Sequence, residues 1–197
     1  SQKVCEGHGA QTILLQGNVS SDEDIKEIFC LFDKKFEKLD VLVNNAGIVD
    51  KTARLDEMTS TRIKNMVSIN LIGAMLVAKE AVQRMSTRNK GSGGNIVNIS
   101  SAAAKLGSAG QYIDYAVTKA GLDLFTKGLA EEVATEGIRV NAVRPGIIET
   151  EIHAKGGLPN RTKTMAPKVP MRRSGTAKEV AEAILFLSSQ KASYITG

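Results

Sequence analysis

Asn95-Ile-Val-Asn-Ile-Ser100 and Ile138-Arg-Val-Asn-Ala-Val143 are two short apolar runs separated by a helical pattern from about Ile113 to Glu136. Gly137 follows that pattern directly, as glycine often follows the last turn of a helix. A strand, a helix and a second strand in this order predict two parallel strands joined by a crossover helix. This stretch therefore decides the fold class.

The same alternation continues in both directions. Ser21 and Asp24 have the spacing of a helix-capping box, which predicts a helix start at this point. Upstream the pattern predicts, in order, a strand at Thr12–Val19, a helix from Ser21 to about Lys38, a strand at Asp40–Asn45 and a helix from about Ser60 to Met85. Downstream it predicts an irregular loop or lid at 147–175, rich in Gly and Pro, and a last helix from about Thr176 to Ser189.

Strands that alternate with helices of this length predict a single α/β domain over residues 1–197, with a doubly wound parallel sheet covered on both faces. The length of 197 residues and the 42% hydrophobic content suit one buried core and are too small for two. The 26 basic and 21 acidic residues are interspersed, so the net charge of +5 indicates a solvated surface. With aromatic residues at 4% and no basic stripe, we expect no nucleic-acid partner.

The sequence has no signal for a disulfide framework, a metal site, secretion or a membrane span. Cys5 and Cys30 have no CxxC neighbour, which favours buried or idle thiols in a reducing compartment. His8 and His153 have no carboxylate or histidine cluster at ligand spacing, so we expect no metal site. Neither a signal-peptide core nor an uninterrupted apolar run near 18 residues is present. These features predict a cytoplasmic protein without a membrane span.

Polar and small residues follow four of the predicted strands. In doubly wound sheets, ligands bind at the carboxyl ends of the strands, near the point where the strand order reverses. The residues that close these strands are Asn18-Val19, Asn45-Ala46-Gly47, Ser100-Ser101 and Pro145-Gly146. One edge of the sheet is therefore expected to hold the functional site.

Tyr115 and Lys119 lie four residues apart at the start of a predicted helix, so both side chains share one face. An ammonium beside a phenol favours the phenolate and lowers the phenol pKa toward neutral pH. A tyrosine of this kind can act as general acid or base on an alcohol or carbonyl oxygen. Taken alone, the pair is better explained as a surface pair on an amphipathic helix.

The order of the motifs removes that ambiguity. Asn44-Asn45-Ala46-Gly47, Ser100-Ser101, Tyr115 with Lys119, and Pro145-Gly146 occur in one sequence at compatible spacings. Over essentially all 197 residues the chain resembles the short-chain dehydrogenase/reductase family. The resemblance implies a Rossmann-like fold and hydride transfer between a nicotinamide cofactor, NAD or NADP, and a small-molecule alcohol or carbonyl. The region Ser101–Lys119 is similar to bacterial 3-oxoacyl-thioester reductases and to sugar dehydrogenases.

The resemblance also implies catalytic roles. Tyr115 corresponds to the acid/base, Lys119 to its pKa-lowering partner and a ligand of the nicotinamide ribose, and Ser101 to the group that polarises the substrate oxygen. Asn70 corresponds to a residue that locally breaks its helix and binds a proton-relay water. Ser101 is favoured over Ser100 because an alternating strand directs Ser100 to the opposite face. Ser101 precedes Tyr115 by fourteen positions where the family usually has thirteen, so we expect a longer loop within 102–114. Tyr112 is set aside, because Ala116 occupies the position four residues later.

The resemblance implies a set of cofactor-binding residues as well. Asn18-Val19 matches an Asp-Val pair that binds adenine, and the carbonyl oxygen of Asn retains part of the acceptor capacity of Asp. The full implied set is Asn18, Val19, Asn45, Ala46, Gly47, Ile99, Tyr115, Lys119, Pro145, Gly146, Ile148 and Thr150. Gly91-Ser-Gly-Gly94 is not included, because a dinucleotide loop follows a strand and opens a helix, whereas this tract follows a helix and opens a strand.

Two parts of the family pattern are not found in this sequence. The first part is the opening strand with its Gly-rich turn and helix, together with the second strand, whose end selects NAD or NADP. The second part is the final strand. We therefore expect a domain that is truncated at both ends and a sheet that is incomplete. The cofactor preference therefore cannot be read. Two hypotheses stay open: a piece of a working NAD(P)-dependent oxidoreductase, or a truncated, cofactor-deficient relative that acts as an interaction module.

Two structural expectations follow. The helices around Leu71–Met85 and Tyr115–Val133 carry apolar residues on more than one face, and the resemblance implies that they form the interface of a homodimer or homotetramer. In the family's strand order 3-2-1-4-5-6, Thr12–Val19 and Asp40–Asn45 are the third and fourth strands and flank the two that are absent. We expect residues outside this sequence to fill the gap. The alternatives are direct pairing of Thr12–Val19 with 41–45, or detachment of that segment from the sheet.

Overall fold

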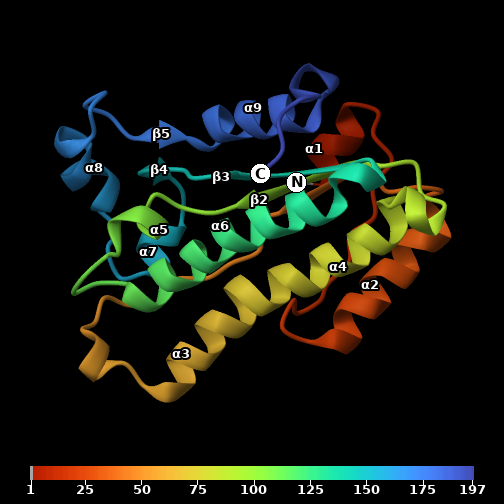
Figure 1. Ribbon diagram of the computed structural model, residues 1–197. Helices are drawn as coiled ribbons and strands as arrows, with labels where there is room; N and C mark the ends of the chain where they lie inside the picture. The colour runs from red at the N-terminus through yellow and green to blue at the C-terminus, as the bar shows by residue number, and fades with distance from the viewer. Residues whose placement is uncertain (1) are drawn as a thin grey trace.

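The computed structural model describes residues 2–197 and shows an α/β domain built on a parallel sheet (Figure 1). Within the described residues this sheet has the order β1-β2-β3, formed by Val41–Asn44, Gly94–Ile99 and Ile138–Val143. The predicted strands at 40–45, 95–100 and 138–143 are confirmed to within a residue at each end. Their register pairs Val41 with Asn95 and Gly94 with Ile138.

Two layers of helix enclose this sheet. On one face α4 (Ala74–Met85) and α6 (Ile113–Val133) cover the apolar side chains of β2 and β3. Their shared core contains Ala78, Ala81, Met85, Ile96, Ala130, Val133, Ile138 and Val140. On the other face α9 (Ala177–Ser188) lies across β2 and β3, and Arg139 and Asn141 donate hydrogen bonds to the residues that follow α9. The doubly wound α/β class is thus confirmed.

The helix α2 (Asp22–Lys35) packs beside α4 at the outer side of the sheet. The Ser21 side chain accepts a hydrogen bond from the backbone N–H of Asp24, as the capping pattern predicts. The helix ends at Lys35 instead of Lys38 because Phe36 takes an extended conformation. An Arg84–Asp33 ion pair at 2.6 Å joins α4 to α2.

The predicted strand at Thr12–Val19 is wrong. Residues 10–18 have no regular secondary structure, and within residues 2–197 β1 pairs only with β2. A strand needs a neighbour for its backbone hydrogen bonds, and this segment has none. Direct pairing of Thr12–Val19 with 41–45 is therefore also wrong, and the expectation that residues outside this sequence fill the gap stays a prediction. Val41 and Val43 on β1 keep 37% and 42% of their surface exposed.

The long helix of Ser60–Met85 is confirmed, with one irregularity. It consists of α3 (Ser60–Val67), a π-helical turn at Ser68–Gly73, and α4. By length and composition alone, this helix could cross a membrane. It also has the character of a core helix, since Met66, Asn70 and Ala78 are buried within the domain.

The segment 147–175 is more ordered than the sequence indicates. It contains α7 (Ile152–Lys155) and α8 (Arg161–Met165), and the short strands β4 (Ile148–Glu149) and β5 (Gly175–Thr176) pair at its base. The remaining short helices are α1 (Gln2–Gly7) and α5 (Ala103–Leu106). Turns of 3-10 helix occupy Leu55–Glu57, Thr87–Asn89, Ala134–Glu136, Ala166–Lys168 and Gln190–Ala192. Cys5 on α1 and Cys30 on α2 are both exposed, so these thiols are not buried.

Candidate active site

Tyr115 and Lys119 lie in the first two turns of α6, beside the carboxyl end of β2. The Lys119 Nζ atom is 5.6 Å from the centre of the Tyr115 ring. The same ammonium donates a hydrogen bond of 2.6 Å to the backbone oxygen of Ile99, the last residue of β2. Lys119 is buried, and among residues 2–197 the nearby carboxylate of Asp123 is paired with Arg144 instead. The helix and the strand end therefore hold the charged amine next to the phenol.

Ser100 and Ser101 point in different directions, as the alternation of a strand requires. The buried Ser100 hydroxyl donates to the backbone oxygen of Lys119. The Ser101 side chain instead accepts from the N–H of Ala103, and it acts on Tyr115 to lower the pKa of that phenol. The segment between Ser101 and Tyr115, where one additional residue is expected, contains α5 and turns at Gly107 and Gly110, both with positive φ.

The pKa values of Tyr115 and Lys119 shift in directions that differ from those expected for an isolated Tyr–Lys pair. Burial raises the pKa of Tyr115 above its ordinary value of 10, and the hydrogen bond with Ser101 lowers it only in part. Burial also lowers the pKa of Lys119 to about 8, against the opposing charge of Asp123. The expected lowering of the Tyr115 pKa by Lys119 is therefore not present in this geometry, because desolvation dominates at both groups. Tyr115 is held as a protonated phenol.

Asn70 lies within the π-helical turn and is almost fully buried. Its Oδ1 accepts a hydrogen bond of 2.7 Å from the N–H of Ile48, and its Nδ2 donates one of 2.8 Å to the oxygen of the same residue. The irregular turn that the family resemblance implies is present here. The Asn70 amide clamps the loop that follows Gly47.

The turn Asn45-Ala46-Gly47 closes β1 and lies against this cluster. A β-carbon on Gly47 would lie 3.2 Å from Asn70 Oδ1 and 3.7 Å from Lys119 Nζ. Asn44, one residue earlier, donates from Nδ2 to the backbone oxygen of Ala74. The structure thus brings together Gly47, Asn70, Ile99 and Lys119, with Ser101 and Tyr115 beside them.

The other candidate cofactor residues lie around the same sheet edge. The backbone oxygen of Pro145 accepts from the N–H of Ala102, which places the turn Pro145-Gly146 beside Ser101. Ile148 belongs to β4, and Thr150 is exposed at the start of the lid. Gly146 is exposed as well.

Asn18 and Val19 lie near the carboxyl edge of the sheet, although no strand precedes them. The backbone oxygen of Val19 packs against Gly73 of the π-helical turn. The Asn18 side-chain oxygen accepts from both the N–H and the hydroxyl of Ser20, so the acceptor that we expect to face adenine is already engaged. The Asn18 amide N–H groups are left as the donors at this position.

Comparison with known proteins agrees with this arrangement. A family model described as enoyl-(acyl carrier protein) reductase matches residues 1–197. An uncharacterised oxidoreductase of Escherichia coli K12, YgfF, is 48% identical over 189 residues, which are 96% of this chain and 76% of that protein. The chain belongs to the short-chain dehydrogenase/reductase family. It is therefore an enzyme of the NAD(P)-dependent oxidoreductase class.

Two further proteins of this family are similar to the chain. The 3-oxoacyl-[acyl-carrier-protein] reductase FabG of Buchnera aphidicola subsp. Acyrthosiphon pisum is 39% identical and aligns over 98% of this chain and 75% of its own length. The crystal structure of a short-chain type dehydrogenase/reductase from Mycobacterium marinum superposes with a TM-score of 0.91 at 28% identity, covering 98% of this chain and 75% of that one. The chain thus spans about three quarters of these short-chain dehydrogenase/reductases.

The residues at this site fit one end of a nicotinamide cofactor. Lys119 carries three N–H donors and uses one on Ile99, so two remain for ribose hydroxyls. The backbone at Gly146 is uncrowded, since nothing lies within 4 Å of an added β-carbon, and this allows a ligand to approach closely. Within residues 2–197 no glycine-rich turn joins a strand to a helix for the pyrophosphate. No group of His, Cys, Asp or Glu in the described part of the chain could hold a metal.

Two features of this region have no signal in the sequence. Asp114, whose side chain is 1% exposed, forms an ion pair of 2.8 Å with Arg62 of α3 and accepts from the N–H of Tyr115. Tyr112, set aside for lack of a partner four residues later, donates from its hydroxyl to Gly156 of the lid. Both partners are distant in the chain, so neither pairing has a local pattern. The sequence does carry a signal of close packing at Gly73, because an isolated glycine within a helix often marks a close neighbour.

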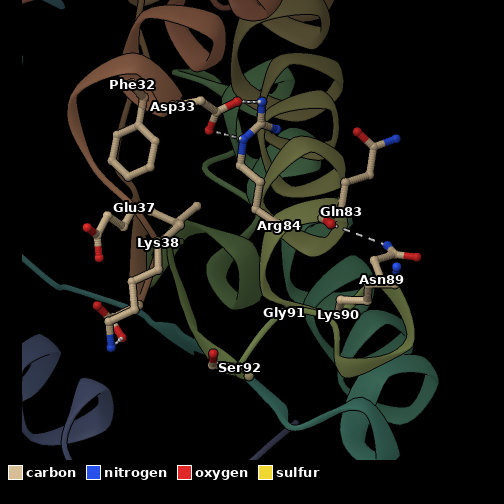
Figure 2. A pocket seen from close by; sticks show the side chains of 13 residues that line it. Phe32, Asp33, Glu37, Lys38, Gln83, Arg84, Asn89, Lys90, Gly91 and Ser92 are labelled. Carbon is tan, nitrogen blue, oxygen red and sulfur yellow. Dashed lines mark hydrogen bonds and ion pairs between the residues drawn. The ribbon is translucent and has the colours of Figure 1, made fainter.

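Gly91-Ser-Gly-Gly94 lies at the opposite, amino end of the strands. Figure 2 shows Gly91 and Ser92 beneath the end of α4, next to a hollow of about 220 Å³ that Lys38 and Arg84 also line. A β-carbon on Gly91 would collide with the backbone oxygens of Arg84 and Met85, and one on Gly93 would lie 2.5 Å from the oxygen of Gly137. Close packing of the chain explains these glycines.

Proposed function

We propose that this enzyme interconverts an alcohol and a carbonyl, with NAD or NADP as hydride carrier and Tyr115 as the general acid and base. The observation that carries the proposal is the position of one phenol beside a serine and a lysine. The Ser101 side chain acts on Tyr115 to lower the pKa of the phenol, and the centre of the Tyr115 ring lies 5.6 Å from Lys119 Nζ. This set of groups matches what proton transfer to a carbonyl oxygen requires.

In the reducing direction the nicotinamide supplies a hydride to the carbonyl carbon when the cofactor is bound. Tyr115 donates its phenolic proton to the carbonyl oxygen, and the Ser101 hydroxyl donates a hydrogen bond to the same atom. Lys119 binds ribose hydroxyls through its free N–H groups and stabilises the phenolate left after proton transfer. Asn70 holds the loop at Ile48 with its side chain, so a proton-relay water would be bound by its backbone.

The pKa directions favour reduction at neutral pH. Because burial raises the pKa of Tyr115, the phenol is protonated and ready to donate. Oxidation of an alcohol needs the phenolate and is therefore expected to require a more alkaline solution. Lys119 loses its charge as the pH rises through about 8, so cofactor binding through its ammonium weakens above that value.

For the substrate, we favour a 3-oxoacyl thioester over a sugar. FabG proteins at 36–42% identity carry the name 3-oxoacyl-[acyl-carrier-protein] reductase. An open hollow of about 490 Å³ lies beside the start of α6; Leu55, Ala109 and Ile113 line its apolar part, and Arg54 and Asp56 its charged part. Apolar side chains of this kind suit an acyl chain better than a sugar.

We further propose a cytoplasmic homodimer or homotetramer that associates through α4 and α6. Both helices pack on the sheet with one face and leave large apolar side chains exposed on another. These side chains are Met75, Val117 and Leu124, with Ile72 in the adjoining π-helical turn; their exposed fractions run from 42% to 72%. Apolar residues concentrated in this way are typical of a subunit interface.

The second candidate function is that of an interaction module without a cofactor. It is favoured by the unpaired outer edge of β1 and by the lack of a glycine-rich turn within the described residues. Calorimetric titration with NADPH and with NADH separates the two. Saturable 1:1 binding of either nucleotide, lost on Lys119→Met substitution, supports the enzyme. Absence of binding by the unsubstituted chain contradicts it and favours the module.

A further inference from the structure

The lid has little packing of its own. Its two ends meet at the β4–β5 pair, where the N–H of Gly175 also bonds to the oxygen of Ile147. Between these ends, residues 150–174 are all described, and Gly156 alone among them is buried. A segment without an apolar core is positioned by its few contacts with the rest of the molecule.

One of these contacts is buried and involves Tyr112. Its hydroxyl donates a buried hydrogen bond of 3.0 Å to the backbone oxygen of Gly156. A β-carbon on Gly156 would lie 3.1 Å from the Tyr112 hydroxyl and 3.1 Å from Val49 Cγ1. A larger residue at this position would crowd the contact, so glycine suits this close approach of the lid.

The side chain of Arg161 in α8 lies over the ring of Tyr112. Its guanidinium lies 5.4 Å from the centre of the Tyr112 ring and donates a hydrogen bond of 2.7 Å to the side-chain oxygen of Gln111. Burial raises the pKa of Tyr112, so its hydroxyl remains a donor through neutral and mildly alkaline pH. The tyrosine thus joins the lid to α6 by its hydroxyl and by its ring.

This junction borders the catalytic groups. Tyr112 precedes Tyr115 by three residues, which is about one helical turn. Val49, on the other side of Gly156, follows Ile48, the residue that Asn70 clamps. The lid is therefore fastened at the point where the start of α6 meets the loop after Gly47.

We propose that Tyr112 is a positioning residue that latches the lid over the active site and so sets how tightly the enzyme holds its carbonyl substrate. The effect on substrate rests on the proposed function, whereas the latch itself does not. A buried neutral hydrogen bond typically changes an equilibrium by about fivefold. Loss of the hydroxyl is expected to increase the open fraction of the lid by about that factor.

Hydrogen exchange of the full chain tests the latch without cofactor or substrate. In Tyr112→Phe, amides of residues 152–168 should exchange about fivefold faster, while those of β2 and β3 keep their rates. Tyr194→Phe is the matched control, because Tyr194 is fully exposed and its loss should change nothing. Gly156→Ala, which crowds the same contact from the lid side, should accelerate the same amides.

Kinetics complete the test. In Tyr112→Phe the KM for a carbonyl substrate should rise about fivefold while kcat and its pH dependence stay unchanged, because Tyr115 is intact. Unchanged lid exchange overturns the latch, and acceleration spread over the whole chain reduces Tyr112 to a structural residue. Faster lid exchange with an unchanged KM overturns its effect on substrate. Absence of turnover in the unsubstituted chain counts against the proposed function alone.

Discussion

The backbone oxygen of Val19 lies 2.5 Å from the position that a β-carbon on Gly73 would occupy. This contact holds Asn18 and Val19 against the π-helical turn of Asn70, although the residues before them form no strand. The glycine is thus what allows the candidate adenine-binding pair to reach the edge of the sheet.

Gly73→Ala should lower the free energy of unfolding by about 1–3 kcal/mol, because the new methyl group must displace backbone instead of a flexible side chain. Gly128→Ala is the matched control on α6, where nothing lies within 4 Å of the added carbon. That substitution should stabilise the chain by about 0.5–1 kcal/mol through helix propensity alone. Urea denaturation of the two variants measures both effects, and equal stabilities would contradict this account of Gly73.

The regular elements could be predicted because their signals are local. The alternating apolar pattern of Ile138–Val143 and the cap at Ser21 depend on neighbouring residues, and the structure has both. Thr12–Val19 carries the same apolar pattern but no strand forms, since strand formation also depends on a partner that the local sequence does not contain. The short helices α7 and α8 were not predicted because segments this brief have no periodicity to detect.

Asp114→Ala should destabilise the fold by about 3 kcal/mol, because it leaves Arg62 charged, 10% exposed and without its closest partner. Asp56→Ala provides the comparison, since the Arg54–Asp56 pair is about 70% exposed on both sides. Its loss should change the stability by less than about 0.5 kcal/mol. Thermal or urea unfolding would show the difference, and similar small losses in both variants would mean that the buried pair contributes little.

The candidate site could be predicted as a set of residues but not as a set of protonation states. Tyr115 and Lys119 are four apart on one helix, so their proximity follows from spacing. The direction of their pKa shifts depends on burial by residues distant in the chain, and burial reverses the expected lowering at Tyr115. The roles given to these residues stay predictions until they are tested by substitution.

Lys119→Met should stabilise the fold near pH 7 while removing cofactor binding. The pKa of Lys119 falls from 10.5 in the unfolded chain to about 8 in the fold, so the buried ammonium costs about 3 kcal/mol below pH 8. Loss of the hydrogen bond to Ile99 offsets about 1 kcal/mol of this, which leaves a gain of about 2 kcal/mol.

The effect of Lys119 on stability changes with pH in a predictable direction. Between pH 8 and 10.5 the unfolded lysine holds more protons than the folded one, so this residue makes the unsubstituted chain more stable as the pH rises through that window. The advantage of the Met variant should therefore shrink above pH 8 and reverse near pH 10.5, where the lost hydrogen bond to Ile99 outweighs the remaining cost of the charge. Urea denaturation of both proteins across this range measures the difference, and a constant difference would show that Lys119 is not buried as a charge.

Leu124→Glu should dissociate the proposed dimer. Leu124 is 72% exposed on α6 in the face assigned to the interface, and a buried carboxylate there has no partner. Leu14→Glu is the control, since Leu14 is 75% exposed and lies outside the helices. Light scattering at micromolar concentration should give a monomer for Leu124→Glu and an oligomer for the control. A monomeric unsubstituted chain would contradict the proposed interface.

Turnover of a carbonyl substrate with NADPH or NADH by the Tyr115→Phe variant, compared with Tyr194→Phe, tests the central claim most directly. The variant keeps the ring against Lys119 and removes only the proton that Tyr115 is proposed to donate. The account predicts that kcat falls by about 10²–10⁴-fold in Tyr115→Phe, with nucleotide affinity nearly unchanged and full activity in Tyr194→Phe. Near-normal turnover by Tyr115→Phe would contradict it.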